Sequence, residues 1–306
     1  MIGALFRRRY RLVHAHEEAI FLALLLRPFF RYRLVYDMHS SLPQQMTNFR
    51  FTRSRFWIGL LERMETAALR RADGVITICP ELAELALARG APPDRHFLIE
   101  NSLFDPVLLA RPAEAEEEEI PFPVQEGGPL ILYAGTFEAY QGIDLLLGAF
   151  ARIGDRLPDA RLLLVGGSPE QTEEARRAVE SLGIGGRCDV HGRIPVAAAR
   201  RLMGRADLFV SPRVSGTNTP LKLYELMARG VPLLATRIRS HTQVLDDGIA
   251  FLVDPDPEAM AAGIAEALKA RERRERIAGA ARERYRERYG REAYEAKMDA
   301  LFRRVL

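Results

Sequence analysis

Short apolar runs alternate with amphipathic stretches along the whole chain. Four such runs in the first part predict strands, at residues 11–16, 33–39, 74–80 and 96–101. Six more in the second part predict strands at residues 129–135, 160–167, 187–192, 207–212, 231–236 and 250–254. The stretches between them have the period of about 3.6 residues expected of helices. This alternation predicts parallel sheets covered by helices, with ligands bound beyond the carboxyl ends of the strands.

A proline-rich, acidic segment separates the two series of strands. It covers residues 111–128, RPAEAEEEEIPFPVQEGG, and its run of glutamates is typical of a solvated spacer. A chain of 306 residues is long enough for about two domains. We therefore expect an N-terminal Rossmann-like domain over residues 1–110, a linker over 111–128 and a second α/β domain over 129–306.

Composition agrees with an ordinary soluble enzyme. Hydrophobic residues make up 48% of the chain and charged residues 28%, with a formal net charge of +3. Dense Arg and Glu after residue 257 indicate an exposed helix face rather than a nucleic-acid surface. Neither Cys79 nor Cys188 has metal-ligand spacing, so both are expected to pack in a core. The longest apolar run, residues 19–26, is far shorter than the ~20 residues that cross a bilayer, and no cleavable signal is recognisable, so we expect a cytoplasmic location.

Arginine and aromatic residues are concentrated in the first 60 residues. Ten arginines there are opposed only by Glu17, Glu18 and Asp37. They are interleaved with aromatic residues that include Phe29, Phe30, Tyr32, Phe49, Phe51, Phe56 and Trp57. This pattern suits a peripheral contact with the anionic inner face of a membrane, or a lipid-phosphate acceptor. An arginine-rich surface without a partner explains the pattern equally well.

The richest chemical signal lies at residues 207–236, DLFVSPRVSGTNTPLKLYELMARGVPLLAT, which predict strand, polar loop, helix and strand. The helix begins at Pro220, where a proline loses no hydrogen bond, and a helix N-terminus offers free N–H groups and a positive dipole end to an anion. Lys222 in the first turn suits a diphosphate, while Glu225, three residues on, suits the two hydroxyls of a ribose. The segment therefore predicts a nucleotide-sugar site.

This segment resembles the donor-binding segment of the family 4 nucleotide-sugar glycosyltransferases, which are retaining enzymes of the GT-B fold. In that family two glutamates separated by seven residues lie on such a loop and helix. Glu225 matches the second glutamate, and Thr217 stands in place of the first. The resemblance continues in ILYAGTFEAYQGIDLLLGAF, RADLFVSP, RLVHAHEE and VYDMHSSLP, and covers nearly the whole chain. It implies an α/β fold of GT-B architecture, with two Rossmann-like parallel-sheet domains.

The resemblance also implies a set of donor-binding residues. They are Gly135, Thr136, Gly192, Arg193, Arg213, Thr217, Thr219, Leu221, Lys222 and Glu225. Many relatives hold the diphosphate with an arginine and a lysine shortly after the glycine, where this chain has Thr136 and Gln141. Either Arg213 and Lys222 offset the charge instead, as we expect, or donor binding is weak.

On the acceptor side, His39 matches the histidine that in relatives touches the acceptor or the transferred sugar. A histidine there hydrogen-bonds a sugar hydroxyl or moves a proton near neutral pH, so His39 is a candidate catalytic residue together with Glu225. His16 and Glu17, at the end of the preceding strand, are further acceptor-side candidates, whereas His14 is expected to serve packing. We expect no metal and no cofactor beyond the donor, because the segments facing the site show no Asp-x-Asp triad and no clustered His or Cys.

One departure from the family concerns the start of the chain. A first domain of this fold opens with a strand, a Gly-rich loop and a helix, followed by a further βα unit, before the strand that corresponds to residues 11–16. Either the sequence lacks its start or the domain is shortened, and a shortened sheet is expected to expose an edge, bind a partner subunit or dimerise. By resemblance, the last helix packs on the first domain through Tyr285, Tyr289, Tyr294, Met298 and Leu301.

Three functions remain open from the sequence. The first is transfer of a hexose-type sugar from a nucleoside-diphosphate donor to a polysaccharide, glycolipid or related acceptor, with retention of configuration. The second is a non-catalytic sugar-nucleotide-binding or scaffold subunit, which Thr217, Thr136 and Gln141 favour. The third, another GT-B enzyme such as a sugar-nucleotide epimerase, disagrees with the helix motif around Glu225.

Overall fold

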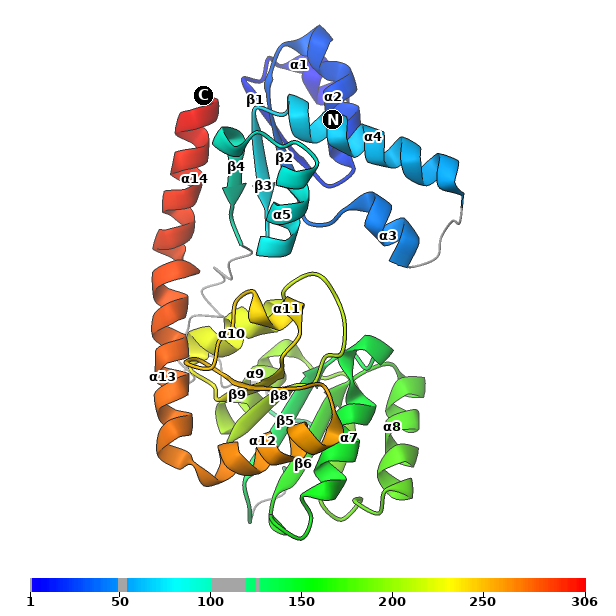
Figure 1. Cartoon of the computed structure of the whole chain (residues 1–306), viewed down its shortest axis with the longest axis vertical. Helices are drawn as coiled ribbons and strands as arrows, with labels where there is room; N and C mark the ends of the chain where they lie inside the picture. The colour runs from blue at the N-terminus through cyan, green and yellow to red at the C-terminus, as the bar shows by residue number, and fades with distance from the viewer. Residues whose placement is uncertain (1, 49–53, 101–118, 125–126) are drawn as a thin grey trace. The chain divides into compact units, whose positions relative to one another are not determined.

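The computed structural model describes residues 2–48, 54–100, 119–124 and 127–306. Most of the linker predicted at residues 111–128 lies outside the described residues, as do Phe49 and Phe51. The chain divides into two compact units (Figure 1): unit 1 comprises Met1–Ser102 with Arg291–Leu306, and unit 2 comprises Leu103–Gly290. Each unit has a parallel sheet, which confirms the predicted fold class.

Unit 1 is built on a four-stranded parallel sheet in the order β1-β2-β3-β4. Its strands lie within the predicted segments and are β1 (Leu12–His16), β2 (Arg33–Met38), β3 (Gly74–Thr77) and β4 (His96–Leu98). Its helices are α1 (Ile2–Arg7), α2 (Ala19–Phe30), α3 (Leu42–Asn48), α4 (Arg55–Arg71), α5 (Pro80–Ala88) and α14 (Arg291–Val305), with a 3-10 turn η1 (Pro93–Arg95).

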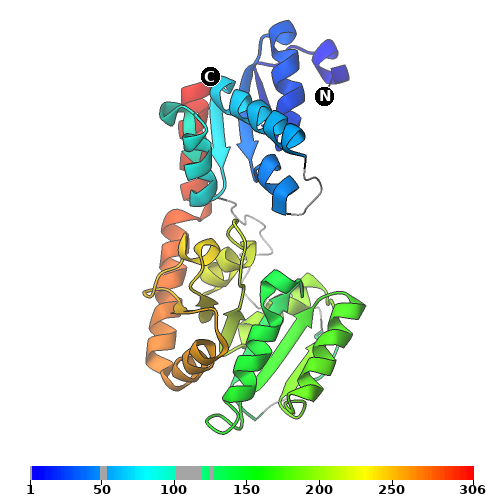
Figure 2. The same cartoon turned by 45° about the vertical axis from the view of Figure 1, so that its right-hand side comes forward.

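Strand β2 shows how the sheet of unit 1 is buried on both faces. Leu34, Tyr36 and Met38 point into a core formed with α2, α4 and α5. Val35 points the other way and joins Leu301 of α14 in a second, smaller core. Figures 1 and 2 accordingly show α14 against one side of the sheet and α2 and α4 on the other. Apolar residues on both faces are typical of parallel strands.

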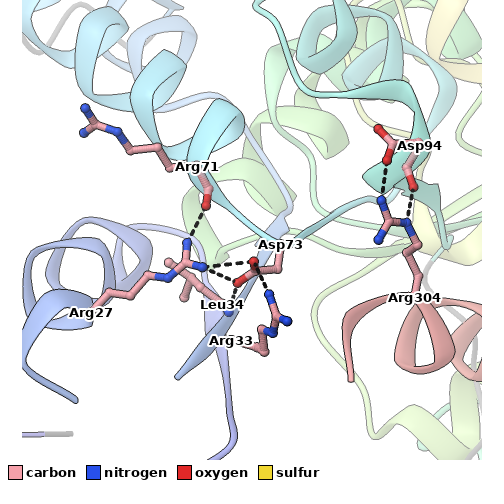
Figure 3. Close-up of polar contacts among 7 residues, drawn as sticks. All are labelled: Arg27, Arg33, Leu34, Arg71, Asp73, Asp94 and Arg304. Carbon is pink, nitrogen blue, oxygen red and sulfur yellow. Dashed lines mark hydrogen bonds and ion pairs between the residues drawn. The ribbon is translucent and has the colours of Figure 1, made fainter. Parts of the chain in front are cut away.

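A single carboxylate joins three elements of unit 1 (Figure 3). Asp73, just before β3, accepts hydrogen bonds from Arg27 Nη2 at 2.9 and 2.7 Å and from the backbone N–H of Leu34 at 2.8 Å. Arg33 Nη1 donates to the same carboxylate at 3.3 Å. Because Asp73 is largely buried, these charge-assisted bonds hold α2 and β2 firmly against β3. On α14, Arg304 forms an ion pair with Asp94.

Unit 2 contains a six-stranded parallel sheet in the order β10-β9-β8-β5-β6-β7. The strands lie within the predicted segments and are β5 (Leu130–Gly135), β6 (Arg161–Gly166), β7 (Cys188–His191), β8 (Leu208–Ser211), β9 (Leu233–Thr236) and β10 (Phe251–Val253). The helices are α7 (Ile143–Arg152), α8 (Pro169–Ser181), α9 (Val196–Arg205), α10 (Leu221–Arg229), α11 (Arg239–Thr242), α12 (Pro257–Lys269) and α13 (Arg271–Arg288), with a 3-10 turn η3 (Ala139–Gln141).

The strand order of unit 2 reverses at β5. From β5 the chain builds outward through β6 and β7, and then returns to the other side of β5 to add β8, β9 and β10. Helices α7, α8 and α12 cover one face of the sheet, and α9, α10 and α13 cover the other (Figures 1 and 2). In such doubly wound sheets, ligands bind beyond the carboxyl ends of the strands where the order reverses. In this sheet, that place lies beyond the carboxyl ends of the neighbouring strands β5 and β8.

The C-terminal helical stretch is divided between the two units. Helix α13 ends at Arg288, and Tyr289 packs its ring 5.0 Å from that of Tyr224 on α10. Tyr285 belongs to the same core of unit 2, so the predicted contact of Tyr285 and Tyr289 with the first domain is wrong. The helix breaks after them, and only the following helix α14 contributes Leu301 to the core of unit 1. No helix of the described residues combines the length and apolar character needed to span a membrane.

Candidate functional site

The predicted donor residues lie at the point where the strand order of unit 2 reverses. Gly135 ends β5, and Arg213 follows β8, its neighbour in the sheet. The polar loop then leads through Pro220, the N-cap residue, into α10. From the first turn of α10, Lys222 Nζ reaches back to within 3.4 Å of the carbonyl oxygen of Ala134 at the end of β5. The structure thus brings Gly135, Arg213 and Lys222 together, as expected from the sequence.

Lys222 and Arg213 form a pair of cations without a counter-charge. Lys222 Nζ lies 4.4 Å from the ring centroid of Tyr133, and Arg213 Cζ lies 4.9 Å from that of Tyr140. Among the described residues, neither cation is paired with a carboxylate. Burial, together with the neighbouring Arg213, lowers the pKa of Lys222 to about 7. Burial also lowers the pKa of Arg213. Enclosed, uncompensated cations at a strand end are the electrostatic signature of an anion site.

Buried polar atoms without partners occur in the segments after β5 and β8 that carry or adjoin these cations. Within the described residues, Arg213 Nε, Thr219 Oγ1 and Gln141 Oε1 are buried and make no hydrogen bond. More than about 90% of buried polar groups in proteins are hydrogen-bonded, so such atoms in one loop region indicate where a ligand completes the network. Thr219 is one of the predicted donor residues, whereas Gln141 stands where relatives carry a cation.

Two glycines of this region, Gly135 and Gly166, are required for different structural reasons. A Cβ on Gly135 would lie 2.9 Å from Lys222 Nζ and 3.0 Å from Tyr133 Oη, so glycine here leaves room for the ammonium group. Gly166 has φ +128°, and a Cβ on it would lie 1.8 Å from the carbonyl oxygen of Gly135. Glycine is therefore required at position 166 because the backbones of β5 and β6 approach too closely there for a Cβ.

Glu225 lies one turn along α10 from Lys222 and is held by two arginines. Arg200 Nε of α9 donates to its Oε1 at 2.9 Å, and Arg229 Nε donates to the same oxygen at 3.2 Å. The Glu225 side chain is only 14% exposed, so these ion pairs compensate a largely buried charge. The sequence did not point to Arg200, because it precedes Glu225 by 25 residues and meets it only through the packing of α9 beside α10.

The remaining predicted donor residues follow β5, β7 and β8 in the chain. The Thr136 carbonyl accepts a 2.6 Å bond from Tyr133 Oη, and Thr136 Oγ1 accepts one from Gln141 Nε2 at 3.3 Å. The Thr217 carbonyl is held by Gln243 Nε2 at 3.0 Å, and half of Leu221 is exposed. Gly192 and Arg193 follow β7, two strands away from β5, with the Gly192 carbonyl accepting a 3.2 Å bond from the Gly166 N–H.

His241 was not recognised from the sequence. It supports the loop after β8 through buried hydrogen bonds. It is fully buried on α11, with Nε2 3.1 Å from Ser211 Oγ and Nδ1 2.8 Å from the carbonyl oxygen of Thr236. Burial lowers its pKa to about 4, although the bond to Thr236 opposes this shift, so His241 is neutral at pH 7. The Thr236 hydroxyl in turn donates to the Arg213 carbonyl. Only the fold brings together the two segments that carry these residues, 211–213 and 236–241.

In unit 1, three histidines gather around one aspartate. Strands β1 and β2 pair in a register that places His16 beside Asp37 at their carboxyl ends. His14 Nε2 lies 3.0 Å from Asp37 Oδ2, and His39 Nε2 lies 3.2 Å from Asp37 Oδ1. His14 is 39% exposed and bonds this carboxylate, so the prediction that it serves packing is wrong. The sequence reading also missed Asp37, because its role depends on strand register.

Charge is strongly coupled within this cluster. Burial alone would raise the pKa of Asp37, but hydrogen bonds with His14 and His39 outweigh it and hold that pKa well below its usual range. The hydrogen bond to Asp37 correspondingly raises the pKa of His39. Glu17 lies beside the cluster in the left-handed region, with φ 51°, and its Oε2 accepts a 2.8 Å bond from Ser40 Oγ. The candidate acceptor residues His16, Glu17 and His39 are thus brought to one edge.

Comparison with known protein families decides the assignment of the chain. The family model described as Glycosyl transferases group 1 matches residues 114–284, and that of the Glycosyl transferase 4-like domain matches residues 2–102. The chain belongs to the group 1 glycosyltransferases. This confirms the family 4 resemblance that the sequence motifs carried.

The chain matches individual relatives over only part of their length. Phosphatidyl-myo-inositol mannosyltransferase from Mycobacterium tuberculosis (strain ATCC 25618 / H37Rv) is 31% identical over 149 residues, which cover 46% of this chain and 37% of that protein. The 2-deoxystreptamine N-acetyl-D-glucosaminyltransferase of Streptomyces fradiae is 33% identical over 218 residues, 67% of this chain and 50% of that protein. The chain therefore matches half or less of the length of these relatives.

Solved structures show the GT-B fold of the chain over nearly its whole length. Sucrose-phosphate synthase from Thermosynechococcus elongatus has a TM-score of 0.75 at 25% identity, covering 99% of this chain and 75% of that one. Anabaena Alr3699/HepE in complex with UDP has a TM-score of 0.79 at 16% identity, covering 99% of this chain and 81% of that one. At such identity the second match bears on the fold alone.

Proposed function

We propose that this glycosyltransferase moves a hexose-type sugar from a nucleoside-diphosphate donor to a polysaccharide, glycolipid or related acceptor, with retention of configuration. The observation that carries the proposal is the uncompensated pair of Lys222 and Arg213 where the strand order reverses. Departure of the diphosphate leaves negative charge on its oxygens, and fixed cations and amides stabilise that charge without reorganising. Lys222, Arg213 and the N-terminus of α10 supply these groups.

Other residues of the site fit the remaining parts of such a donor. We assign the ribose hydroxyls to Glu225 and the phosphate or sugar oxygens to Thr219, whose buried hydroxyl lacks a partner in the described residues. The base is assigned to the region of Gly192 and Arg193 after β7. With Thr217 in place of a glutamate, the sugar hydroxyls lose one acceptor. Retention follows if the acceptor oxygen bonds to the anomeric carbon on the face from which the diphosphate departs, while the leaving phosphate accepts the acceptor's proton.

On the acceptor side we assign His39 the contact with the attacking hydroxyl. His39 is oriented by Asp37, 3.2 Å away, and lies beside His16, with ring centroids 4.2 Å apart. A glycolipid acceptor is supported by the similarity to phosphatidyl-myo-inositol mannosyltransferases. It is also supported by exposed aromatics of unit 1, with Phe29 78% and Trp57 56% exposed.

Peripheral contact at the inner face of a membrane is consistent with a basic cavity in unit 1. This cavity of about 610 Å³ is lined by Arg11, Arg27, Arg31, Arg33, Pro28, Tyr32 and Leu306. Its arginines outnumber the single carboxylate, Asp73, that Arg27 and Arg33 share (Figure 3). Arginine-rich concavities beside exposed aromatics suit anionic headgroups.

A panel of nucleotide sugars tests the proposal. The purified chain is incubated with each radiolabelled donor and with lipid and glycan acceptors, and the anomeric configuration of any product is read by NMR. Transfer with the donor's own configuration supports the proposal. Inversion, or the absence of turnover with every donor despite binding, would contradict it.

A non-catalytic sugar-nucleotide-binding or scaffold subunit is the second candidate. It is favoured by Glu225, whose Oε1 is already held by Arg200 and Arg229, and by Thr217 at the place of the first glutamate. Strand β1 is an edge of its sheet, which offers a surface for a partner subunit or a second copy. Nucleotide binding that survives Glu225→Ala in a partner complex, without turnover, would select this candidate.

A further inference from the structure

A basic cavity lies at the amino ends of the first two strands of unit 1. It has a volume of about 610 Å³, and its lining residues are Arg11, Arg27, Pro28, Arg31, Tyr32, Arg33 and Leu306. Arg11 directly precedes β1, and Arg33 begins β2 with its backbone N–H bonded to the Arg11 carbonyl at 2.8 Å. The candidate acceptor residues lie at or just after the carboxyl ends of the same strands. About 13 Å of strand separates the two ends, because each residue of a strand advances about 3.3 Å. The basic cavity is therefore a separate site.

The basic cavity carries more positive charge than its neighbours neutralise. Asp73 accepts hydrogen bonds from two of the four arginines (Figure 3). Arg11 and Arg31 are both exposed, and neither forms an ion pair within the described residues. In the same part of the chain, no ion pair joins the carboxylate of Leu306 to a guanidinium group of the cavity. Guanidinium groups bind phosphate oxygens through paired, planar hydrogen bonds. A phosphate group would therefore supply both the charge and the acceptor oxygens that the cavity lacks.

The fold holds parts of the basic cavity in place without a ligand. Arg27 donates to the carbonyl oxygen of Arg71 at 2.5 Å as well as to Asp73. Arg31 caps the C-terminus of α2 with φ 48°, and its backbone N–H bonds to the Arg27 carbonyl at 2.9 Å. Glycine adopts this left-handed conformation more readily than arginine, so an arginine here indicates that the side chain has a use. Tyr32, which follows, is buried and donates from its hydroxyl to the backbone of α2. The turn that carries Arg31 is thus fixed.

An exposed apolar stripe on α2 indicates what carries the phosphate. Leu22, Leu25 and Phe29 are all exposed, and their spacing of three and four residues places them on one face of the helix. Phe29 directly follows Pro28, which lines the basic cavity. Arginines beside exposed apolar side chains suit the boundary between anionic lipid headgroups and acyl chains. A phosphate carried by a lipid matches both features, whereas a free phosphate compound matches the arginines alone.

We propose that the basic cavity binds the phosphate group of an anionic lipid. The stripe of α2 then lies at the boundary between the headgroups and the acyl chains. This inference rests on the membrane contact in the proposed function, and it names the group that is bound and the arginines that bind it. It does not rest on sugar transfer, because the cavity shares no residue with the donor cations Lys222 and Arg213 or with His39. Lipid binding and sugar transfer can therefore fail separately.

Two phosphate ligands test the basic cavity and the source of its ligand. Sedimentation measures binding of the full chain to phosphatidylcholine vesicles with and without phosphatidic acid, and calorimetry measures binding of glycerol 3-phosphate. We expect binding to the vesicles that contain phosphatidic acid, and weaker binding of glycerol 3-phosphate. Arg11→Gln combined with Arg31→Gln should weaken both by at least ~10-fold, because two guanidinium groups that bind the phosphate are lost. Phe29→Ser should weaken binding to vesicles and leave the affinity for glycerol 3-phosphate unchanged.

A control with the same loss of charge comes from unit 2. Arg177 on α8 and Arg276 on α13 are exposed, so Arg177→Gln combined with Arg276→Gln should leave both affinities nearly unchanged. Circular dichroism establishes that each variant is folded. An equal loss in the control would overturn the proposal, because net charge alone would then explain the binding. So would the absence of binding to phosphatidic acid vesicles; if glycerol 3-phosphate still bound, the ligand would be a free phosphate compound and not a lipid.

Discussion

Lys222 Nζ lies 4.4 Å from the ring centroid of Tyr133, over the end of β5, with Arg213 as its neighbouring cation. The aromatic face partly stabilises the ammonium group, but no described carboxylate neutralises it. A cation enclosed in this way destabilises the ligand-free protein, while it strengthens the binding of an anion. Stability and donor affinity are therefore expected to respond in opposite directions to changes at Lys222.

The first prediction concerns Lys222 and pH. The pKa of Lys222 is about 7 in the folded chain and near its ordinary value of 10.5 when unfolded. Between these values the unfolded state binds the proton and the folded state does not, so the free energy of unfolding should rise with pH across this window. Lys222→Met should flatten that rise and stabilise the ligand-free protein below pH 7. Urea unfolding from pH 6 to pH 9 measures both; equal pH slopes for the two proteins would contradict the pKa shift.

The second prediction tests whether Glu225 binds the ribose and not the diphosphate of the nucleotide. Glu225→Ala removes the acceptor assigned to the ribose, and a hydrogen bond to a charged group is worth about 1.5–3 kcal/mol. Affinity for a nucleoside diphosphate should therefore fall by roughly 10-fold to 100-fold. Affinity for inorganic pyrophosphate should change little. An equal loss for both ligands would instead show that Glu225 acts by holding Arg200 and Arg229 in place.

The third prediction contrasts two glycines with positive φ. A Cβ on Gly166 would lie 1.8 Å from the Gly135 carbonyl, so Gly166→Ala should cost more than ~2 kcal/mol of stability. Gly183 also has positive φ, but a Cβ there meets nothing within 4 Å, so Gly183→Ala should cost only about 1 kcal/mol. Denaturant midpoints of the two variants measure the difference. Similar losses would show that φ, and not the contact with β5, requires glycine at position 166.

The fourth prediction concerns the exposed aromatics of unit 1. If Phe29 and Trp57 contact a membrane, Phe29→Ser combined with Trp57→Ser should reduce sedimentation with vesicles that contain anionic lipid, because both side chains are more than half exposed. Val196→Ser in unit 2, where the valine is 65% exposed, is the matched control. Wild-type binding should also decrease with salt. No binding to anionic vesicles at low salt would exclude this surface as a membrane contact.

Much of the fold could be predicted from the sequence because its signals are local. Runs such as LLLV at residues 162–165 are too apolar for a surface and too short for a buried helix, which favours strands. Each of the predicted strand segments does contain a strand. The donor region was also predictable, since the loop and the start of α10 are continuous in sequence. Lys222 and Arg213 meet at β5 because the parallel topology makes their placement nearly unavoidable.

The features that the sequence did not reveal depend on register and long-range packing. Asp37 meets His14 only because β1 and β2 pair as they do. Arg200 reaches Glu225 from another helix, and His241 is buried beneath the loop by the fold of α11. Tyr285 and Tyr289 were assigned to the wrong unit, because the sequence before Gly290 has no strong helix breaker to mark the end of α13. Each of these contacts joins two segments whose own sequence patterns do not reveal that they meet.

Calorimetric titration with UDP and GDP tests the central claim most directly. Wild-type protein should bind at least one of them, and Lys222→Ala and Arg213→Ala should each weaken binding by roughly 10-fold to 100-fold, because each removes a charge-assisted contact. Lys269→Ala, at an exposed lysine on α12, should leave the affinity unchanged. Nucleotide affinity that is the same in Lys222→Ala as in the wild type would show that the diphosphate binds elsewhere.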